Sequence, residues 1–550
     1  MATHTQPQSG HVGKLTASEG QKLREFWRIL IQSWDTSMPA PEGASGKVKS
    51  APKGHRRLFS LGRAFAAPPT PEETSAIPPN LLATLKVWDA GPGDIKTIQS
   101  LMVKFPGVRL RFAFLAALKQ DHPDALLLRF LRAEKWNLPK AWIKFAASLN
   151  WRINEYKVDK EVMLKGEAYA LEKSQARGIS SEKKDAQGFA LQLTSGKAFF
   201  HGCDRWNRPV CIVRVRSHDP NTQTQKAIND YIVYCMETVR LLQVSPVETL
   251  VVVFDLTSFT LANWDFPSIK FVIDCFQENY PESLGAMILY NAPWVFSGMW
   301  KIIQGILDPV VAAKVHFING AQELEKVIAR DRILKELGGD EDWEYTYVEP
   351  GPEEKEKLKD KAARDVILAE REQLGDELFS LTAEWIANPD SRSLYSRNDV
   401  IEELRRNYWD LDPYVRVRSI LDRTGIIKGD GLVDFYPAPK PKSDVIEDDI
   451  AESEIAESEV PETEVPGSEC PENEANEKHD PNEEHELDGE HELDGEHEPD
   501  EKHELNEKHG LNEKHGLNEK HELNEKHVVH EKHGVESDTL NETPAPPVAA

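Results

Sequence analysis

The chain has 550 residues and a formal net charge of −27, but this charge is unevenly distributed. From Asp444 to the end it carries 36 Asp and Glu against 7 Lys, a net of −29, whereas the remainder has 57 acidic and 59 basic residues, a net of +2. A nearly neutral body argues against a nucleic-acid-binding protein or an acidic scaffold.

The five cysteines show no metal-ligand spacing, and the N-terminus lacks an apolar signal core. No run of the chain approaches the roughly 18 apolar residues of a membrane span. These features predict a reduced, cytoplasmic compartment, in which any membrane contact is peripheral.

The first predicted helix is Leu15–Trp34, because Thr16 and Glu19 fit a capping box and apolar residues follow at helical spacing. We expect this helix to dock on the main domain. Residues 35–80, rich in Pro, Ala, Gly and Ser, predict a linker. Within it, Gly46–Phe65 has six Lys and Arg, no acid and interleaved Leu and Phe. Such a segment either contacts anionic membrane or is simply a solvated basic linker.

A helical pattern from Pro92 to Trp151 predicts a small helical module, after which strand and helix patterns alternate. The patterns are two strands, two helices and a turn between strands: Val210–Arg216, Glu248–Leu256, Asn229–Leu242, Pro267–Asn279 and Gly202–Pro209. This mixed order predicts an α/β fold with a sheet floor roofed by helices.

The segment Tyr280–Ile318 reads as a βαβ unit. It contains a strand at Leu284–Ala292, an amphipathic helix from Trp294 to Leu307 that stops at Asp308-Pro309, and a strand at Val315–Ile318. The two strands should be parallel, so their N-terminal ends share one sheet edge. Glu282 and Lys314 lie at those ends, and we expect them to converge. A carboxylate beside an ammonium suits a ligand that carries both hydroxyls and a phosphate.

Several ordered matches in this window resemble the CRAL-TRIO lipid-transfer family, above all its fungal phosphatidylinositol-transfer branch. They are YPE (Tyr280–Glu282), NAPW (Asn291–Trp294), LDP (Leu307–Pro309) and Lys314, with further matches at Leu127–Asn137 and His201–Arg216. The resemblance covers roughly residues 100–345. It implies a CRAL-TRIO lipid-binding fold preceded by the small helical module, with an internal apolar pocket.

The resemblance also implies roles for individual residues. Glu282 and Lys314 would hold the inositol hydroxyls and the phosphate. The helix with Trp294, Phe296 and Trp300 would be a movable gate that covers the pocket and touches the bilayer, or, alternatively, an ordinary crossover helix with a buried aromatic stripe. The family pattern is not complete. Glu134 stands where many members have an arginine that follows LRA, and Val311 stands where relatives often have a threonine.

Members that exchange phosphatidylcholine carry hydroxyl residues on the strand leading to the aspartate matched here by Asp255. The corresponding residues are Leu250 and Val252, which share one face of their strand. A phosphate against that face would lose water without gaining a hydrogen bond. The second ligand is therefore predicted to be a hydrophobe such as a sterol or terpenoid rather than phosphatidylcholine, unless both side chains point into packed core.

Residues 350–436 show further helical patterns and predict a C-terminal extension that packs on the lipid domain or binds a partner. The following tail is predicted to be disordered, since so polar a sequence has too little apolar surface to fold. Its histidines recur every six residues from His479 to His533. That spacing reflects repeat expansion or, alternatively, weak zinc or copper buffering.

No catalytic or cofactor motif occurs, and His201, His218 and His316 appear isolated, with structural roles. Asp255 is likewise interpreted as structural. The sequence thus predicts a monomeric, non-enzymatic protein without metal or cofactor, which binds and transfers phosphatidylinositol and transiently contacts membranes. The alternative is a signalling scaffold whose domain binds a regulatory protein or membrane.

The predicted organisation is an N-terminal helix (1–35), a basic linker (36–85), a helical module (86–155), the lipid-binding domain (175–347), a helical extension (350–436) and a disordered acidic tail (437–550).

Overall fold

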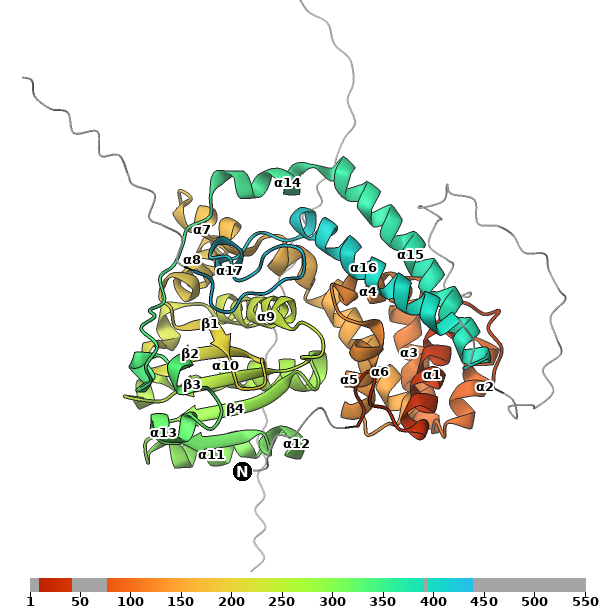
Figure 1. The fold of residues 1–550 in the computed structure, drawn as a ribbon, viewed down its shortest axis with the longest axis horizontal. Helices are drawn as coiled ribbons and strands as arrows, with labels where there is room; N and C mark the ends of the chain where they lie inside the picture. Colours follow the sequence, from red (N-terminus) through yellow and green to blue (C-terminus); the bar gives the residue numbers. More distant parts are fainter. Residues whose placement is uncertain (1–8, 42–76, 390–392, 439–550) are drawn as a thin grey trace, which may run out of the picture. The chain divides into compact units, whose positions relative to one another are not determined.

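A computed structural model describes residues 9–41, 77–389 and 393–438 (Figure 1). The predictions made for the basic segment Gly46–Phe65 and for the histidine repeats concern residues outside these ranges. Within the described ranges, no helix is both long enough and apolar enough to cross a bilayer.

The N-terminal part of the structure is a cluster of helices. They are α1 (Ala17–Gln32), α2 (Pro79–Val87), α3 (Pro92–Lys104), α4 (Gly107–Leu118), α5 (Pro123–Ala133) and α6 (Leu138–Asn150). The capping box predicted for Thr16 and Glu19 is confirmed at the start of α1. Helix α2 overlaps the end of the segment predicted as linker (36–85), so that prediction extended too far. Leu81 and Leu85, one helical turn apart, are fully buried and explain why α2 forms.

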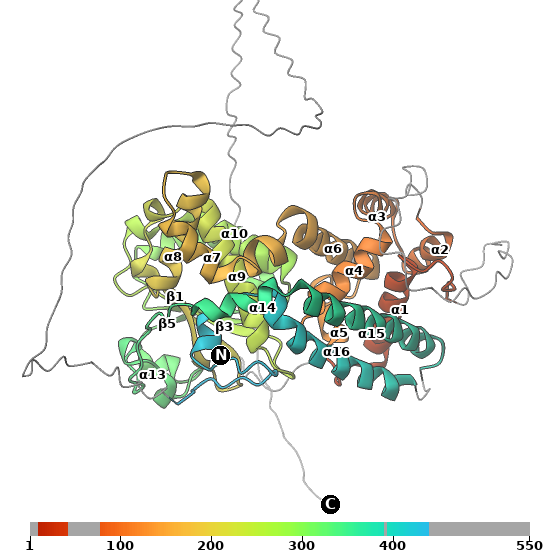
Figure 2. The same cartoon turned by 90° about the horizontal axis from the view of Figure 1, so that it is seen from above.

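The C-terminal extension packs mainly on this cluster. Helices α15 (Lys361–Ala387) and α16 (Ser393–Val415) lie side by side along the module (Figures 1 and 2). Their apolar side chains share one core with α1, α4, α5 and α6. Gly375 lets α15 approach α4 closely, because an added Cβ would lie 2.6 Å from a methyl of Leu115. The first part of the helical extension predicted at 350–436 forms the short α14 (Glu356–Lys359) and then the single long α15.

The α/β domain that follows the helical cluster is built on a five-stranded mixed sheet in the order β1-β2-β3-β4-β5. The strands are β1 (Ala198–Cys203), β2 (Pro209–Arg214), β3 (Leu250–Asp255), β4 (Leu284–Tyr290) and β5 (Val315–Ile318). Strand β1 is antiparallel to β2, and β2 to β5 run parallel. This confirms the predicted α/β class and the parallel βαβ unit.

Helices cover both faces of this sheet. The remaining ones are α7 (Gly166–Gln175), α8 (Ser181–Thr194), α9 (Gln225–Leu242), α10 (Phe266–Asp274), α11 (Phe296–Gln304), α12 (Pro309–Ala312), α13 (Ala321–Leu324) and α17 (Ile420–Arg423). On β3, Val251 and Val253 point into the core that includes α13, whereas Leu250 and Val252 point toward α9. Successive residues of a strand point to opposite faces, so a sheet covered by helices on both faces needs apolar residues at every position of a central strand.

The crossover of the βαβ unit differs from its prediction. Helix α11 ends at Gln304 instead of continuing to Leu307, and Asp308-Pro309 starts the short helix α12 instead of only ending α11. The Asp308 carboxylate accepts a hydrogen bond from the Val310 N–H (2.7 Å), and proline is favoured at the first helical position. Strand β4 ends at Tyr290, two residues earlier than predicted.

Candidate functional site

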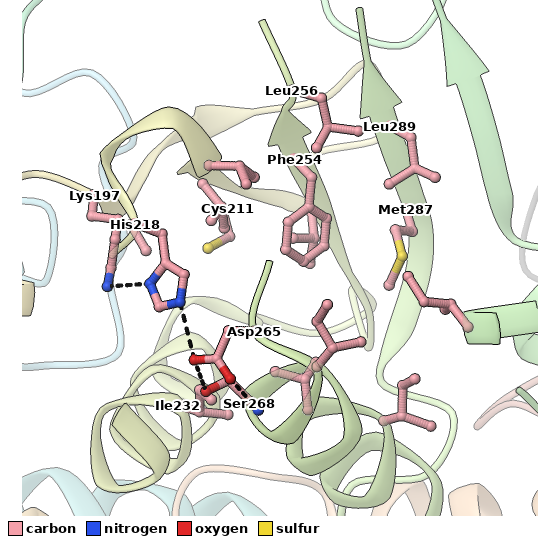
Figure 3. A pocket seen from close by; sticks show the side chains of 18 of the residues that line it. Lys197, Cys211, His218, Ile232, Phe254, Leu256, Asp265, Ser268, Met287 and Leu289 are labelled. Atoms are coloured by element: carbon pink, nitrogen blue, oxygen red, sulfur yellow. Dashed lines mark hydrogen bonds and ion pairs between the residues drawn. The ribbon is translucent and has the colours of Figure 1, made fainter. Parts of the chain in front are cut away.

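An apolar cavity of about 250 Å³ lies between the sheet and helices α9, α10 and α11 (Figure 3). Its floor is formed by alternate residues of the central strands, and its roof by the inward faces of the helices. Nearly every side chain around it is hydrocarbon or aromatic. Such a space is unfavourable for water and favourable for hydrocarbon.

Strand β3 supplies the middle of the floor. Leu250, Val252, Phe254 and Leu256 all line the cavity, as expected from their two-residue spacing. The prediction that Leu250 and Val252 share one face is confirmed, and that face borders the cavity. A ligand lying on it would meet no hydrogen-bonding side chain from this strand.

Helix α11 and the turn that follows it form one wall. Phe296, Trp300, Ile303 and Leu307 line the cavity, and the Phe296 ring packs edge-to-face on Phe259 with centroids 5.7 Å apart. The outer side of this wall is mixed, since Ile302 and Ile306 are 54% and 36% exposed next to the exposed Lys301 and Gln304. Trp294, which precedes the helix, is 88% exposed and does not line the cavity.

Glu282 and Lys314 meet at the N-terminal edge of β4 and β5, as predicted from their positions in the sequence. The Lys314 Nζ lies 3.3 Å from the Glu282 Oε2, and both side chains are about one quarter exposed. Glu282 has a φ of 57°, an unfavourable conformation for a residue other than glycine, which turns the chain just before β4. Strain of this kind persists where the surrounding structure enforces it, often at functional positions.

This ion pair does not itself line the cavity. It lies next to it, because the Lys314 carbonyl accepts a hydrogen bond from the N–H of Met287 (2.9 Å), and the Met287 side chain borders the cavity. Glu134 pairs with Lys144 at 3.2 Å. Val311 packs among apolar side chains. The structure therefore combines an apolar cavity with a neighbouring partly exposed ammonium–carboxylate pair.

The residues interpreted as structural make contacts typical of that role. Asp255 is buried, pairs with Arg216 and accepts a hydrogen bond from the Thr257 N–H (3.0 Å). His201 stacks on Trp343 and hydrogen-bonds Glu341. His218, in contrast, is not isolated, because it belongs to a polar cluster on the cavity wall.

This cluster, which we call the wall cluster, consists of Lys197, His218, Asp265 and Ser268, and it lines the otherwise apolar cavity (Figure 3). The Lys197 Nζ lies 3.0 Å from the His218 Nδ1, and the His218 Nε2 lies 3.0 Å from the Asp265 Oδ2. The Ser268 hydroxyl donates to the same carboxylate oxygen (2.6 Å). A lysine ammonium that donates to a neutral histidine, whose Nε2–H donates to aspartate, gives both ring nitrogens of the histidine a partner.

Burial perturbs the two basic groups of the wall cluster. It lowers the pKa of Lys197 to about 8, and burial together with the adjacent ammonium lowers the pKa of His218. Sequence reasoning missed this cluster because its members come from three separate segments, 21 and 47 positions apart. The only local signal was Asp265 followed three residues later by Ser268, which marks the start of α10.

Comparison with known proteins assigns most of the described chain. A CRAL/TRIO domain model matches residues 193–339, and a CRAL/TRIO N-terminal domain model matches residues 81–146. The chain is 38% identical over 335 residues to CRAL-TRIO domain-containing protein C3H8.02 of Schizosaccharomyces pombe, covering 60% of this chain and 72% of that protein. It is 34% identical over 444 residues to phosphatidylinositol transfer protein CSR1 of Eremothecium gossypii, covering 76% of this chain and 98% of that protein.

A more distant similarity links the chain to Sec14 cytosolic factor of Schizosaccharomyces pombe, at 27% identity over 232 residues. This match covers 39% of the present chain and 74% of that protein.

Proposed function

Because the chain belongs to the CRAL-TRIO family and has fungal phosphatidylinositol transfer proteins among its relatives, we propose that it binds phosphatidylinositol and moves it between membranes. The observation that carries the proposal is the apolar cavity beside the Glu282–Lys314 pair. The cavity would hold acyl chains, which are unfavourable in water. The pair would hold the headgroup at the sheet edge.

The headgroup chemistry follows from the two side chains. The Lys314 ammonium is a donor for a phosphate, and the Glu282 carboxylate accepts hydrogen bonds from inositol hydroxyls. In the absence of ligand the two groups pair with each other at 3.3 Å, so neither charge is left uncompensated. A bound headgroup would replace that long contact with shorter charge-assisted hydrogen bonds.

Helix α11 is the proposed gate. Its inner face, with Phe296 and Ile303, closes the cavity, and its outer face exposes Ile302 beside the polar side chains of Lys301 and Gln304. Apolar side chains flanked by a lysine suit contact with an anionic bilayer surface once the wall leaves the cavity. Trp294 and Phe317, 88% and 47% exposed, extend this outer face with side chains suited to the membrane interface.

The second ligand is proposed to be a mainly apolar lipid instead of phosphatidylcholine. Leu250 and Val252 offer a phosphate no hydrogen bond, and a buried charge without partners is strongly unfavourable. Mass spectrometry of lipid extracted from the purified protein, together with transfer of labelled phosphatidylcholine between liposomes, tests this point. Phosphatidylcholine transfer as fast as phosphatidylinositol transfer would contradict it.

The central experiment is phosphatidylinositol transfer between liposomes by the full-length protein and Lys314→Ala. Loss of a charge-assisted hydrogen bond, worth roughly 1.5–3 kcal/mol, should weaken headgroup binding about ten- to a hundredfold. Lys335→Ala is the matched control, because Lys335 also pairs with a carboxylate, Asp342 at 2.6 Å, but lies outside this site. A folded Lys314→Ala protein with unchanged transfer would refute the headgroup assignment. Absence of any lipid transfer by the wild type would favour the scaffold alternative.

A further inference from the structure

The wall cluster contains hydrogen-bond donors without an acceptor. The Lys197 ammonium has three N–H groups, of which the His218 Nδ1 accepts one. No other hydrogen bond from Nζ to a described residue is found, although Lys197 is only 6% exposed. Lys197 lines the cavity, whose other lining residues are mostly hydrocarbon or aromatic, Phe254 and Ile228 among them. Donors in such surroundings gain from any oxygen that a ligand brings.

We propose that Lys197, held in place by His218 and Asp265, binds a neutral oxygen atom of a ligand that is otherwise hydrocarbon. This inference rests on the proposed lipid-binding function and specifies the class of the second ligand. The ligand would be a long-chain or polycyclic alcohol, or the corresponding carbonyl compound, with one oxygen at the Lys197 end and its hydrocarbon against Leu250 and Val252.

Charge within the wall cluster favours a neutral oxygen. The Lys197 ammonium is already balanced through His218 by the Asp265 carboxylate. A carboxylate or phosphate ligand would add a second negative charge to an apolar cavity that offers no further cation nearby among its lining residues. A pure hydrocarbon would leave the ammonium donors unpaired. A hydroxyl or carbonyl oxygen satisfies a donor without changing the net charge.

The cluster is also rigidly held, as a binding group should be. The Asp265 carboxylate accepts hydrogen bonds from both the N–H and the hydroxyl of Ser268, which fixes it at the start of α10. The side chain of Asn263 donates to the His218 carbonyl at 2.8 Å, which fixes the segment after β2. A ligand oxygen would therefore meet a donor that is already oriented, and less ordering would be needed on binding.

A matched ligand series tests the inference, because the members differ only at the head. Hexadecane, 1-hexadecanol and hexadecanoate are each used at pH 7 to displace a fluorescent apolar probe from the full-length protein. The wild type should bind hexadecanol about tenfold more tightly than hexadecane, as one hydrogen bond to a charged donor allows. Lys197→Met keeps an unbranched apolar side chain, one atom shorter, but removes the donors. It should bind the two ligands within about twofold of each other and bind hexadecane as the wild type does.

Two variants complete the design. Lys270→Met removes an exposed lysine of α10 that pairs with Asp274 outside the cavity, and it should keep the wild-type preference. His218→Gln should reduce the preference by releasing the Lys197 side chain, and it provides a second readout if Lys197→Met does not fold. Equal binding of hexadecane and hexadecanol by the wild type, or an unchanged preference in a folded Lys197→Met or His218→Gln protein, would overturn the inference.

The remaining outcomes separate this inference from the proposed function. Tighter binding of hexadecanoate than of hexadecanol would overturn the neutral-oxygen assignment. Phosphatidylinositol transfer without displacement by any of the three ligands would refute the inference and leave the proposed function standing. Failure of both the displacement and the transfer of phosphatidylinositol would refute the proposed function and, with it, this inference.

Discussion

The N-terminal helical cluster together with α15 and α16, which we call the helical body, and the CRAL/TRIO domain each bury a cation linked to an aspartate. The link is direct in the helical body and passes through His218 in the CRAL/TRIO domain. In the helical body, Arg397 is fully buried and donates to Asp124 through both terminal nitrogens (2.9 and 2.5 Å) and to Thr382 through Nε (2.8 Å). Its guanidinium also lies 4.9 Å from the centre of the Trp385 ring. All sides of that cation are occupied by protein.

In the CRAL/TRIO domain, the corresponding cation, Lys197, contacts protein and also lines the cavity. Lys197 contacts His218, and its remaining donors have no described acceptor. A buried cation linked to an aspartate therefore stabilises the core where packing is complete and offers a binding group where it borders a cavity. Changes in the helical body should affect stability, whereas changes around the cavity should affect ligand binding and the pH dependence of stability.

The largest expected effect is at Arg397. Arg397→Met should lower the free energy of unfolding by about 3–5 kcal/mol, because it leaves the buried Asp124 carboxylate without its counterion. Urea denaturation measures this change. Arg405→Met is the control, since Arg405 makes only a long contact of 3.5 Å with the exposed Glu402, and it should change stability by less than about 0.5 kcal/mol. Equal stability of Arg397→Met and wild type would show that the pair does not support the core.

The second effect is the pH dependence of stability that the buried Lys197 should cause. Burial lowers the pKa of Lys197 to about 8, against an ordinary value near 10.4 in the unfolded chain. Between these values the unfolded chain holds a proton that the folded chain has released, so stability contributed by this residue rises with pH. Wild type should therefore gain roughly 3 kcal/mol of stability relative to Lys197→Met between about pH 8 and 10.5.

The comparison with Lys197→Met removes contributions from other groups. His218 and Asp265, which face the ammonium, both have pKa values below their ordinary ranges. For His218 the cause is burial beside the ammonium, and for Asp265 the hydrogen bonds from Ser268 and His218 outweigh its burial. Both are fully deprotonated above pH 8 and do not titrate in the window. Parallel stability curves for the two proteins, obtained by denaturation at each pH, would show that Lys197 keeps an ordinary pKa.

The third effect compares neighbouring residues on the two faces of β3. Val253→Phe inserts a ring into a packed core and should destabilise by about 1–3 kcal/mol. Val252→Phe inserts the same ring into the cavity, where space is available, and should destabilise by less than about 1 kcal/mol while displacing bound lipid. Thermal unfolding and lipid extraction give both readouts. Similar destabilisation by the two substitutions would mean that the cavity is not available to an added side chain.

Much of the fold could be predicted from local patterns, because those patterns are set by neighbours in sequence. The two-residue alternation of Leu250 to Val253 assigned opposite faces correctly, and Val315–Ile318 forms β5 with the predicted bounds. Glu282 and Lys314 were brought together by topology alone, since parallel strands share an N-terminal edge. Helix α2 was missed because its burial depends on tertiary contacts that linker-like composition does not reveal.

The wall cluster could not be predicted in the same way. His218 has no recognisable motif around it, and its partners lie at the start of β1 and at the start of α10. Their convergence depends on how the segment after β2 folds back over the cavity, which no periodicity encodes. The end of α11 was misplaced for a related reason, because a proline at position 309 both stops one helix and starts another.

The smallest expected change in stability distinguishes the outer from the inner side of the proposed gate. Trp294 is 88% exposed, so Trp294→Ala should change the free energy of unfolding by less than about 0.5 kcal/mol. Trp300 lines the cavity and packs edge-to-face on Phe317 at 5.3 Å, so Trp300→Ala should cost about 2 kcal/mol, roughly half the value for a fully buried tryptophan.

Vesicle binding should depend on Trp294, although the stability of the fold does not. If the outer face of α11 meets the bilayer, Trp294→Ala weakens vesicle binding about tenfold, equivalent to about 1.4 kcal/mol of lost apolar contact. Sedimentation with phosphatidylinositol-containing vesicles measures it, and unchanged binding by Trp294→Ala would remove this tryptophan from the proposed membrane contact.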